Sequence, residues 1–555
     1  MASTSESLSA QILKQPLLWL LLLCAANLFA FLGGHSLWDV DEPNNAVCAR
    51  EMLLAGNWWV PMFNGDYRFD KPILIYWIMM PLDWIFGVNE WTARLPSALS
   101  ITGLVLVIWA MTRRLLADCD TALRDKTAFM AAALFASALH IIVIARAAVP
   151  DPLLMLCLGI ALPALLISYL EQKKQPSEKM PGLLIVAYIA IGFGTLAKGP
   201  IAGLMPLLIV AAFLTLMGEW KNWRLFHPFK GASIALAVAL PWYIAVGVIT
   251  DGVWLEGFLF HHNIDRFTDP MQGHRGFPGL YILSILLGWF PWTGLLIATV
   301  IFGSWRLNIL RGEPVRLFML CWLAVYILFF SIARTQLPNY VLPVFPAAAM
   351  LMAWGWAFAS DQQRQRATRW LAWSALLLSV GIVIGGGLAL DKQWPGEGYY
   401  ILAMLPMVIA SGWWLWKKQG DVRLALVAGM AVSMLLLAGW SVKGIDHHKI
   451  SKTLADTATE AGFDGSELAT FHYFQPSLLF YHGGRLPMLA DVKQVGEWLV
   501  AGKAVVISQS ALELLPKEVI PYLIVHERLF GMYARRWLLL VSLQPLDEVR
   551  EGETT

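Results

Sequence analysis

Residues 127–170 read TAFMAAALFASALHIIVIARAAVPDPLLMLCLGIALPALLISYL and hold almost no charge. Two apolar runs, 127–146 and 152–170, flank a connection in which Arg146 and Asp151 are the charged side chains. A run of ~20 apolar residues is long enough to cross the hydrocarbon core of a bilayer as a helix. The stretch therefore predicts two membrane-spanning helices joined by a short polar turn.

The same pattern recurs along most of the chain. Of its 555 residues, 58% are hydrophobic and 14% are charged, whereas a soluble protein has about 25% charged residues. The segment 72–88 is apolar but short and contains Pro81, which favours an interfacial helix over a span. The other apolar runs predict thirteen spans, at 16–34, 95–112, 127–146, 152–170, 181–197, 200–217, 231–250, 279–302, 317–333, 339–357, 370–390, 399–416 and 424–442.

Basic residues divide the connections into two classes. With a cytoplasmic N-terminus, every inside loop carries at least three Lys or Arg residues and the outside connections carry mostly one, as the positive-inside rule requires. After Trp440, β-rich runs such as AVVIS and RWLLLVSL alternate with helical stretches, which predicts a small α/β domain outside the membrane. The predicted division is a transmembrane domain over 1–442, with the first outside loop at 35–94, and an α/β domain over 443–555.

The fold class is thus mainly α: a polytopic membrane protein of about thirteen helices with a small C-terminal α/β domain. The net charge of +2 excludes a typical nucleic-acid binder, and the five cysteines show neither a metal-site spacing nor a disulfide framework. The chain carries no Walker or Rossmann glycine fingerprint, so no nucleotide cofactor is expected. A reaction outside the membrane then requires a preactivated substrate, such as a sugar on a lipid phosphate.

The unusual polar residues collect in the outside connections, which predicts a site at the outer membrane surface. Asp41 and Glu42 follow the first span. Acids at a helix start commonly complement the helix dipole; the alternative is that Asp41 acts as a general base or a metal-associated carboxylate. Asp70 and Lys71 precede the interfacial segment, where the lysine either extends toward the headgroups or holds a lipid-linked phosphate.

Two further connections carry cations and histidines. Lys198 ends an apolar run as an isolated cation, which favours a binding role over packing. His261 and His262, with Arg266 about one turn on, are either solvated loop residues or ligands of a divalent metal ion.

The connection between the spans at 317–333 and 339–357 holds Arg334 and Tyr340. A guanidinium and a phenol both donate hydrogen bonds to phosphate, whereas the alternative for Tyr340 is an aromatic side chain of the membrane interface. Arg146 and Asp151 lie at the two ends of another outside connection. They either belong to the site or only form an ion pair with each other.

Taken in order, these motifs resemble those of a known family. They are LWDVDEPNNAVCAREMLLAGNWWVP, FDKPILIYW, VPDP, LAKGP, HHNIDRF and LPNYVLP. Over nearly its whole length the chain is similar to the bacterial aminoarabinose lipid A transferases and the related protein mannosyltransferases, which are type C glycosyltransferases. The resemblance implies an enzyme of the bacterial inner membrane. It would move a sugar from a polyprenyl phosphate, at the periplasmic face, to an acceptor that for the aminoarabinose transferases is a phosphate of lipid A.

The resemblance also implies roles for single residues. Asp41 matches the acid that activates the acceptor, and Asp151 matches an acid of the same cavity. Lys71 matches the phosphate-binding lysine, Arg266 a second cation toward the donor phosphate, and Tyr340 a tyrosine hydrogen-bonded to it. The predicted sites are catalytic Asp41, Glu42 and Asp151; donor-phosphate-binding Lys71, Arg266, Tyr340, Lys198 and Arg334; and, for a divalent metal ion, Asp70, His261 and His262.

Some positions depart from the family's pattern. Asn44 and Asn45 stand where Arg-Tyr is usual, and Gln336 stands where the aminoarabinose enzymes often carry Lys. These changes remove positive charge near a site that receives an anionic acceptor, so lipid A, a protein and another envelope glycan stay open as acceptors. A lipid-linked sugar transporter or flippase is disfavoured, because transporters place ionisable groups near the bilayer midplane. We expect a monomer with no nucleic-acid partner.

Overall fold

The computed structural model describes residues 14–260, 276–277 and 279–543. Its contacts divide the chain into two compact units. We call them the helical unit, which holds residues 1–32, 69–75 and 94–441, and the mixed unit, which holds residues 33–68, 76–93 and 442–555.

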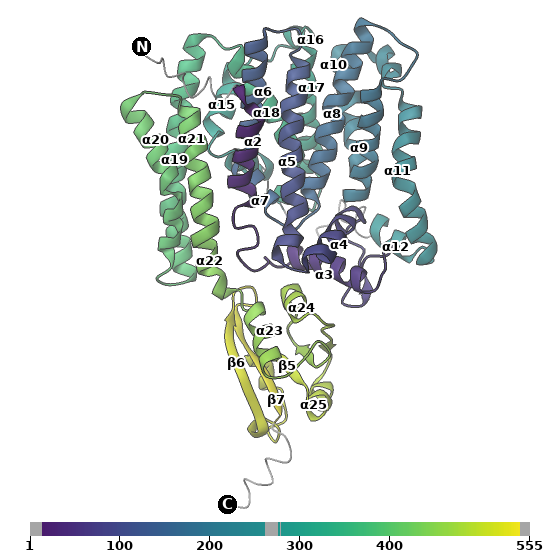
Figure 1. Cartoon of the computed structure of the whole chain (residues 1–555), viewed down its shortest axis with the longest axis vertical. Coiled ribbons are helices and arrows are strands. Elements are labelled where there is room, and N and C mark those ends of the chain that lie inside the picture. The colour runs from purple at the N-terminus through teal and green to yellow at the C-terminus, as the bar shows by residue number, and fades with distance from the viewer. Residues whose placement is uncertain (1–13, 261–275, 278, 544–555) are drawn as a thin grey trace, which may run out of the picture. The chain divides into compact units, whose positions relative to one another are not determined.

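The helical unit is a bundle whose long helices run side by side (Figure 1). Short 3-10 or π-helical segments, labelled η, extend or join several of them. The elements are α2 (Pro16–Cys24), η1 (Ala25–Phe29), α5 (Glu90–Leu115), α6 (Thr121–Ala136), α7 (Leu139–Ala145), α8 (Asp151–Lys174), α9 (Gly182–Lys198), α10 (Ile201–Met217), η2 (Trp220–Phe226), α11 (Pro228–Ile249), α12 (Val253–Glu256), α14 (Leu280–Gly288), α15 (Thr293–Phe302), α16 (Leu307–Arg311), α17 (Pro314–Ile332), η4 (Pro338–Val344), α18 (Phe345–Ala357), α19 (Asp361–Gln393), η5 (Gly398–Met404), α20 (Leu405–Lys417), α21 (Val422–Leu436) and η6 (Leu437–Ser441).

The bundle has the dimensions and composition of a membrane domain. Among the described residues, eight helices are long and apolar enough to cross a membrane, or up to ten if each of two bent helix pairs is one span. Each of the thirteen predicted spans overlaps one of these elements or one of the shorter apolar helices. The structure confirms a mainly α, multi-pass membrane protein, and the count of thirteen stays a prediction.

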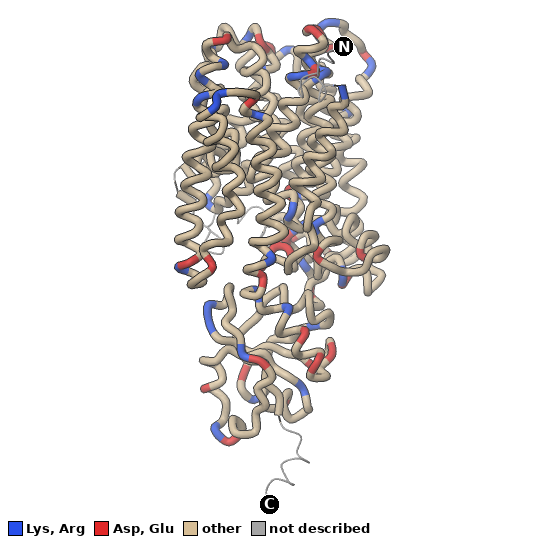
Figure 2. Tube along the Cα trace, turned by 60° about the vertical axis from the view of Figure 1, so that its left-hand side comes forward, with Lys and Arg blue, Asp and Glu red and all other residues tan. Residues whose placement is uncertain are grey.

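Charge is distributed along the bundle as a bilayer requires. The middle parts of the helices are nearly free of Lys, Arg, Asp and Glu, and these residues gather toward the helix ends (Figure 2). A charged side chain at the bilayer centre costs several kcal/mol, so this distribution agrees with the predicted spans.

Two of the predicted spans are broken, and their breaks contact each other. The axis bends by 63° between α6 and α7 and by 117° between α14 and α15. Leu139 N donates to Phe290 O at 2.9 Å, and Trp292 Nε1 donates to Ser137 Oγ at 3.0 Å. A broken helix in a membrane must satisfy its freed backbone groups within the protein, and here each break supplies partners for the other.

The mixed unit combines the first loop with the C-terminal part of the chain. The first loop contributes α3 (Asp41–Leu54), β1 (Met62–Phe63), β2 (Asp66–Tyr67) and most of α4 (Leu74–Phe86), the segment predicted as an interfacial helix. The C-terminal part contributes α22 (Val442–Gly444), η7 (Ile445–His448), α23 (Ser451–Glu460), β3 (Leu468–Phe471), α24 (Pro476–His482), β4 (Met488–Leu489), α25 (Val492–Val500), β5 (Ala504–Ser508), α26 (Gln509–Leu512), η8 (Ile520–Tyr522), β6 (Leu523–Gly531) and β7 (Arg536–Leu543).

The C-terminal strands form a five-stranded sheet of order β4-β3-β5-β7-β6. β3 pairs in parallel with β4 and β5, and β7 pairs antiparallel with β5 and β6. The central strand β5, AVVIS, is buried along its whole length, as expected of a strand covered on both faces. The predicted α/β character of the C-terminal part is confirmed.

The first loop packs within the mixed unit through specific bonds. The guanidinium of Arg50 on α3 donates to Leu479 O at 3.2 Å and to Phe480 O at 2.9 Å. Asn64 Nδ2 donates to Leu486 O at 3.0 Å, and Leu486 N donates back to Asn64 Oδ1 at 2.9 Å. The contact grouping therefore differs from the predicted boundary at 442/443, and the division into separately folding domains stays a prediction.

Candidate active site

One ion pair joins two neighbouring helices of the helical unit. α8 begins at Asp151, α9 ends at Lys198, and Lys198 Nζ lies 2.5 Å from Asp151 Oδ1. An acid at a helix start and a cation at a helix end each complement the dipole of their own helix. The side chains of Asp151 and Lys198 are 12% and 19% exposed, so the surrounding protein strengthens their attraction relative to water.

Tyr340 adds an aromatic ring to this pair. Tyr340 lies in η4, and Lys198 Nζ is 5.6 Å from its ring centre, within the range of a cation–π interaction. The neighbouring Asn339 accepts a hydrogen bond at its Oδ1 from His140 Nε2 at 3.1 Å, which ties η4 to α7. The structure thus brings together three predicted site residues, Asp151, Lys198 and Tyr340.

Asp70 and Lys71 belong to the same unit and are half-buried. The preceding residue, Phe69, packs against Gly257, where an added Cβ would lie 2.7 Å from the Phe69 ring. Gly257 therefore permits a close approach that any other residue would obstruct, and this approach fixes the chain just before Lys71.

The predicted phosphate-binding Arg334 and the loop residue Arg146 have different surroundings. Arg334 follows α17 and is exposed. Arg146 donates to the backbone carbonyls of Asn27 and Phe31, each at 3.3 Å, and so holds the chain that leaves η1. Arg146 therefore has a structural role, and Arg334 remains accessible to a ligand.

The two adjacent acids of the first loop, Asp41 and Glu42, have different surroundings. Glu42 is 3% exposed, and its Oε2 accepts a hydrogen bond from Trp38 N at 2.7 Å. Asp41, the first residue of α3, is exposed. Glu42 therefore stabilises the chain that enters α3, and Asp41 presents its carboxylate to solvent or to a substrate.

Several charged residues of the mixed unit were missed by the sequence analysis. Asp39 accepts hydrogen bonds from the backbone N and the Oγ of Ser477, and burial raises the pKa of Asp39 to about 6 although these bonds lower it. Asp446 and Lys449 form an ion pair at 2.9 Å. Asp39 stands in the motif LWDVDEP, two residues before Asp41, and this position was the available signal. Asp446 and Lys449 carry no local pattern.

Some predicted residues lie outside the described part of the chain. These are His261, His262 and Arg266. Of the three predicted metal ligands, only Asp70 is described, and one carboxylate does not make a metal site.

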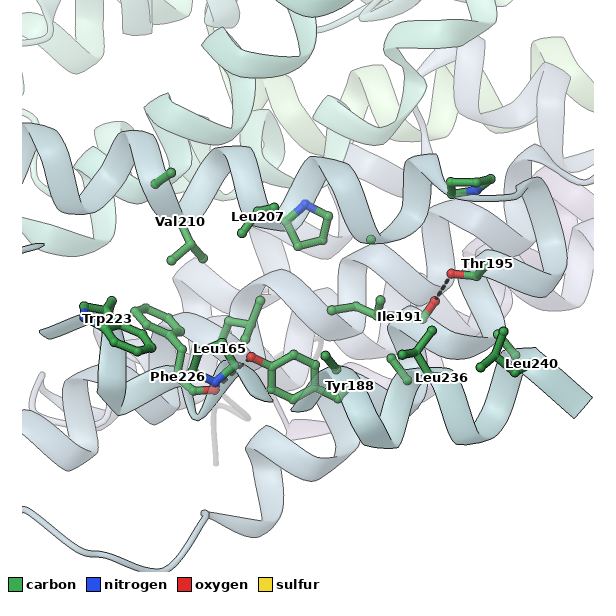
Figure 3. A pocket seen from close by; sticks show the side chains of 18 of the residues that line it. Leu165, Tyr188, Ile191, Thr195, Leu207, Val210, Trp223, Phe226, Leu236 and Leu240 are labelled. Carbon is green, nitrogen blue, oxygen red and sulfur yellow. Dashed lines mark hydrogen bonds between the residues drawn. The ribbon is translucent and has the colours of Figure 1, made fainter. Parts of the chain in front are cut away.

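An apolar cavity of about 910 Å³ lies between α9, α10 and α11. Side chains of the three helices converge on it, with Trp223 and Phe226 at one end and Thr195 and Leu240 at the other (Figure 3). Two hydrogen bonds join residues that line the cavity: Tyr243 Oη donates to Thr195 O at 3.0 Å, and Tyr188 Oη donates to Phe226 O at 2.8 Å. The remaining walls are almost wholly apolar, which suits a hydrocarbon chain.

The chain is similar to known glycosyltransferases. A family model described as dolichyl-phosphate-mannose-protein mannosyltransferase matches residues 70–244. The undecaprenyl phosphate-alpha-4-amino-4-deoxy-L-arabinose arabinosyl transferase of Yersinia enterocolitica is 30% identical over 417 residues, which cover 74% of this chain and 67% of that protein. The chain belongs to this arabinosyl transferase family. The family member of Erwinia tasmaniensis is 33% identical over 319 residues, and the chain spans little more than half of it, 55%.

The chain also shares its fold with a solved structure. ArnT from Cupriavidus metallidurans, in its crystal structure bound to undecaprenyl phosphate, matches with a TM-score of 0.76 at 19% identity, covering 94% of this chain and 97% of that one. The match extends over both units, so the chain shares the fold of that protein, as the resemblance led us to expect. In this chain, the residues matched by the mannosyltransferase family model, 70–244, include Lys71, Asp151 and Lys198.

Proposed function

We propose that this chain transfers an aminoarabinose-like sugar from undecaprenyl phosphate to lipid A, at the periplasmic face of the bacterial inner membrane. The observation that carries the proposal is the position of a charged cluster beside an apolar cavity. Thr195 of α9 lines the cavity, and Lys198, paired with Asp151, ends the same helix one turn later. A polyprenyl phosphate needs both parts, because its phosphate is charged and its tail is a long hydrocarbon. The names of the relatives indicate the sugar and the lipid.

In this proposal the donor phosphate binds to Lys198 at the end of α9 and to the other predicted cations. Lys71 and Lys198 supply positive charge and the Tyr340 hydroxyl donates a hydrogen bond, with Arg266 and Arg334 as further cations. Asp151 orients Lys198 through their short ion pair. The polyprenyl tail extends along the cavity between α9, α10 and α11.

The proposed reaction is a single inverting displacement at the anomeric carbon. The bond between that carbon and the phosphate oxygen breaks, and the phosphate keeps the electron pair. The acceptor oxygen forms the new bond from the opposite face of the sugar. The cations stabilise the negative charge of the leaving phosphate, and Asp41 orients the acceptor or takes its proton. We assign this role to Asp41 rather than Glu42, because the Glu42 carboxylate already holds Trp38 N.

No step is assigned to a metal ion, since Asp70 is the one described ligand of the predicted metal site. The divalent ion at Asp70, His261 and His262 stays a prediction that a metal analysis of the purified protein can check. We retain as proposals the monomeric state and the division into a transmembrane domain over 1–442 and a periplasmic domain over 443–555.

The deciding experiment identifies the bound lipid and the acceptor. The protein is purified in mild detergent, its lipids are determined by mass spectrometry, and it is then given sugar-loaded undecaprenyl phosphate with lipid A. The proposal expects bound undecaprenyl phosphate and a sugar-modified lipid A of correspondingly higher mass. Absence of any lipid phosphate, with solute flux in liposomes, would contradict the enzyme proposal. Transfer to a protein or another glycan, but not to lipid A, would correct the acceptor.

Filling the cavity is expected to weaken donor binding selectively. Gly203 on α10 lines the cavity, and a Cβ there would lie 3.9 Å from its nearest neighbour, Ile191. Gly203→Leu places a branched side chain where the tail binds, and we expect the donor KM to rise roughly tenfold, since tenfold corresponds to about 1.4 kcal/mol of lost binding. Gly203→Ala is the matched control, because its methyl group adds little volume.

Steady-state kinetics with two donors distinguish this effect from misfolding. A donor with a short isoprenoid tail should be transferred equally well by Gly203→Leu and the unmodified enzyme. Equal losses with short and long donors would show that the tail lies elsewhere.

A further inference from the structure

The chain just before α3 is held by side chains from the far end of the sequence. Ser36 N donates to Asp446 Oδ2 at 3.0 Å, and Ser36 Oγ donates to Asp446 Oδ1 at 2.7 Å. Leu37 N donates to Tyr481 Oη at 2.8 Å. Residues 36–39 form neither helix nor strand pairing, so their backbone groups need such partners. The C-terminal part of the mixed unit supplies them.

The next two residues are held in the same manner. Trp38 N donates to Glu42 Oε2 at 2.7 Å, and Asp39 N donates to Tyr533 Oη at 3.2 Å. The Asp39 carboxylate in turn accepts Ser477 N at 2.9 Å and Ser477 Oγ. Each of the four consecutive backbone N–H groups from residue 36 to residue 39 is therefore bonded to a side chain, and three of the four side chains lie beyond residue 442.

A buried lysine completes the attachment. Lys449 Nζ donates to Ser36 O at 2.8 Å, pairs with Asp446 Oδ1 at 2.9 Å and lies 3.8 Å from a ring centre of Trp38. The Lys449 side chain is 3% exposed. Burial acts to raise the pKa of Asp446, but the Lys449 ammonium and the Ser36 donors outweigh it and hold that pKa below its usual range. Asp446 is thus a charged acceptor for the Ser36 N–H near neutral pH.

We propose that Asp446, Ser477, Tyr481 and Tyr533 are positioning residues for Asp41. Asp446, Tyr481 and Tyr533 hold backbone N–H groups of residues 36–39, and Ser477 holds the Asp39 carboxylate. Asp41, the first residue of α3, follows two residues after Asp39. Asp41 is exposed, so few side-chain contacts restrict its carboxylate, and the segment before it fixes how the backbone enters α3. This inference rests on the proposed role of Asp41, and it assigns the C-terminal part a function in the reaction that differs from binding the acceptor.

A merely structural role predicts different behaviour from a positioning role. Loss of a structural bond lowers stability and the amount of active enzyme, whatever residue stands at position 41. Loss of a positioning bond lowers the turnover of folded enzyme and acts only through the Asp41 carboxylate. A displacement of about 1 Å in a reacting group can cost roughly 10²-fold in rate, so one lost bond is measurable.

The experiment uses the full-length protein in lipid nanodiscs, with Tyr533→Phe and Asp446→Asn as the two variants. Tyr522→Phe is the matched control, because Tyr522 is an exposed tyrosine of the same C-terminal part. Hydrogen exchange with mass spectrometry follows the peptide that contains residues 36–39. Losing one hydrogen bond should speed its exchange about three- to tenfold, and Tyr522→Phe should leave it unchanged.

Kinetics supply the second measurement. We expect kcat to fall about tenfold in Tyr533→Phe, with the donor KM within about twofold of the unmodified enzyme. In an Asp41→Asn background, Tyr533→Phe should cause no further fall, since coupled residues are not additive. Equal falls in both backgrounds, or unchanged exchange at residues 36–39, would overturn the inference. If hydrogen exchange at residues 36–39 became faster but the unmodified enzyme showed no transfer at all, the proposed function would be contradicted. The inference that the C-terminal part holds residues 36–39 would not be.

Discussion

Asp41→Asn is expected to lower kcat by roughly 10²- to 10⁴-fold, the usual contribution of a positioned general base. Asn keeps the size and the helix-start preference of Asp but cannot take a proton. Asp41 is exposed at the first position of α3, so the substitution should leave the fold intact. The measurement is the rate of sugar transfer from a purified donor under single-turnover conditions, in which product release does not limit the signal.

Asp66→Asn provides the matched control for this change. Asp66 is an exposed acid of β2 in the same loop, and its substitution should leave kcat unchanged. The two variants should also retain equal amounts of bound undecaprenyl phosphate, because the proposal gives Asp41 no part in donor binding. Full activity of Asp41→Asn would remove Asp41 from the mechanism.

Lys71→Met is expected to lower kcat/KM by roughly 10²-fold or more, as truncation of a close charged partner usually does. Methionine keeps the length of the apolar stem but removes the ammonium that, in the proposed mechanism, neutralises the donor phosphate. Because the proposal has Lys71 act on both the bound donor and the leaving phosphate, kcat should fall as well as donor affinity. The measurements are transfer kinetics and the amount of undecaprenyl phosphate that copurifies.

Two controls separate charge from geometry. Lys71→Arg retains the positive charge with a different donor arrangement, so it should recover part of the lost affinity. Lys179→Met removes an exposed lysine of the helical unit and should change neither measurement. If Lys71→Met bound and transferred normally, the donor phosphate would have to bind elsewhere.

Hydropathy alone was sufficient for most of the helical unit. Every predicted span overlaps an apolar helix, and the segment that Pro81 marked as interfacial is the separate short helix α4. The bends between α6 and α7 and between α14 and α15 could not be predicted, because a break inside an apolar run hardly changes its mean hydropathy. They depend on contacts such as Leu139 with Phe290, which join distant parts of the chain.

The candidate site was predictable to the extent that its residues are unusual in a membrane. Asp151, Lys198 and Tyr340 were identified because a charge or hydroxyl at the end of an apolar run requires a reason, and the structure brings them together. The pairing of Asp151 with Lys198 was not predicted, since it depends on which helices are neighbours. Asp446 and Lys449 were missed because a polar residue just after a span is ordinary in sequence.

The bonds between Ser36 and Asp446 join the first loop to a part of the chain that the ribosome makes much later. These residues are 410 positions apart, and ribosomes add about 5 to 20 residues per second, so the first loop waits roughly 20 to 80 s for its partners. Throughout that interval all the predicted spans can enter the membrane, while the N–H groups of Ser36, Leu37 and Asp39 lack the side chains that hold them. If the inference above holds, a nascent or C-terminally truncated chain has an Asp41 that follows a segment not yet held in place, and its turnover should stay low until synthesis has passed Tyr533.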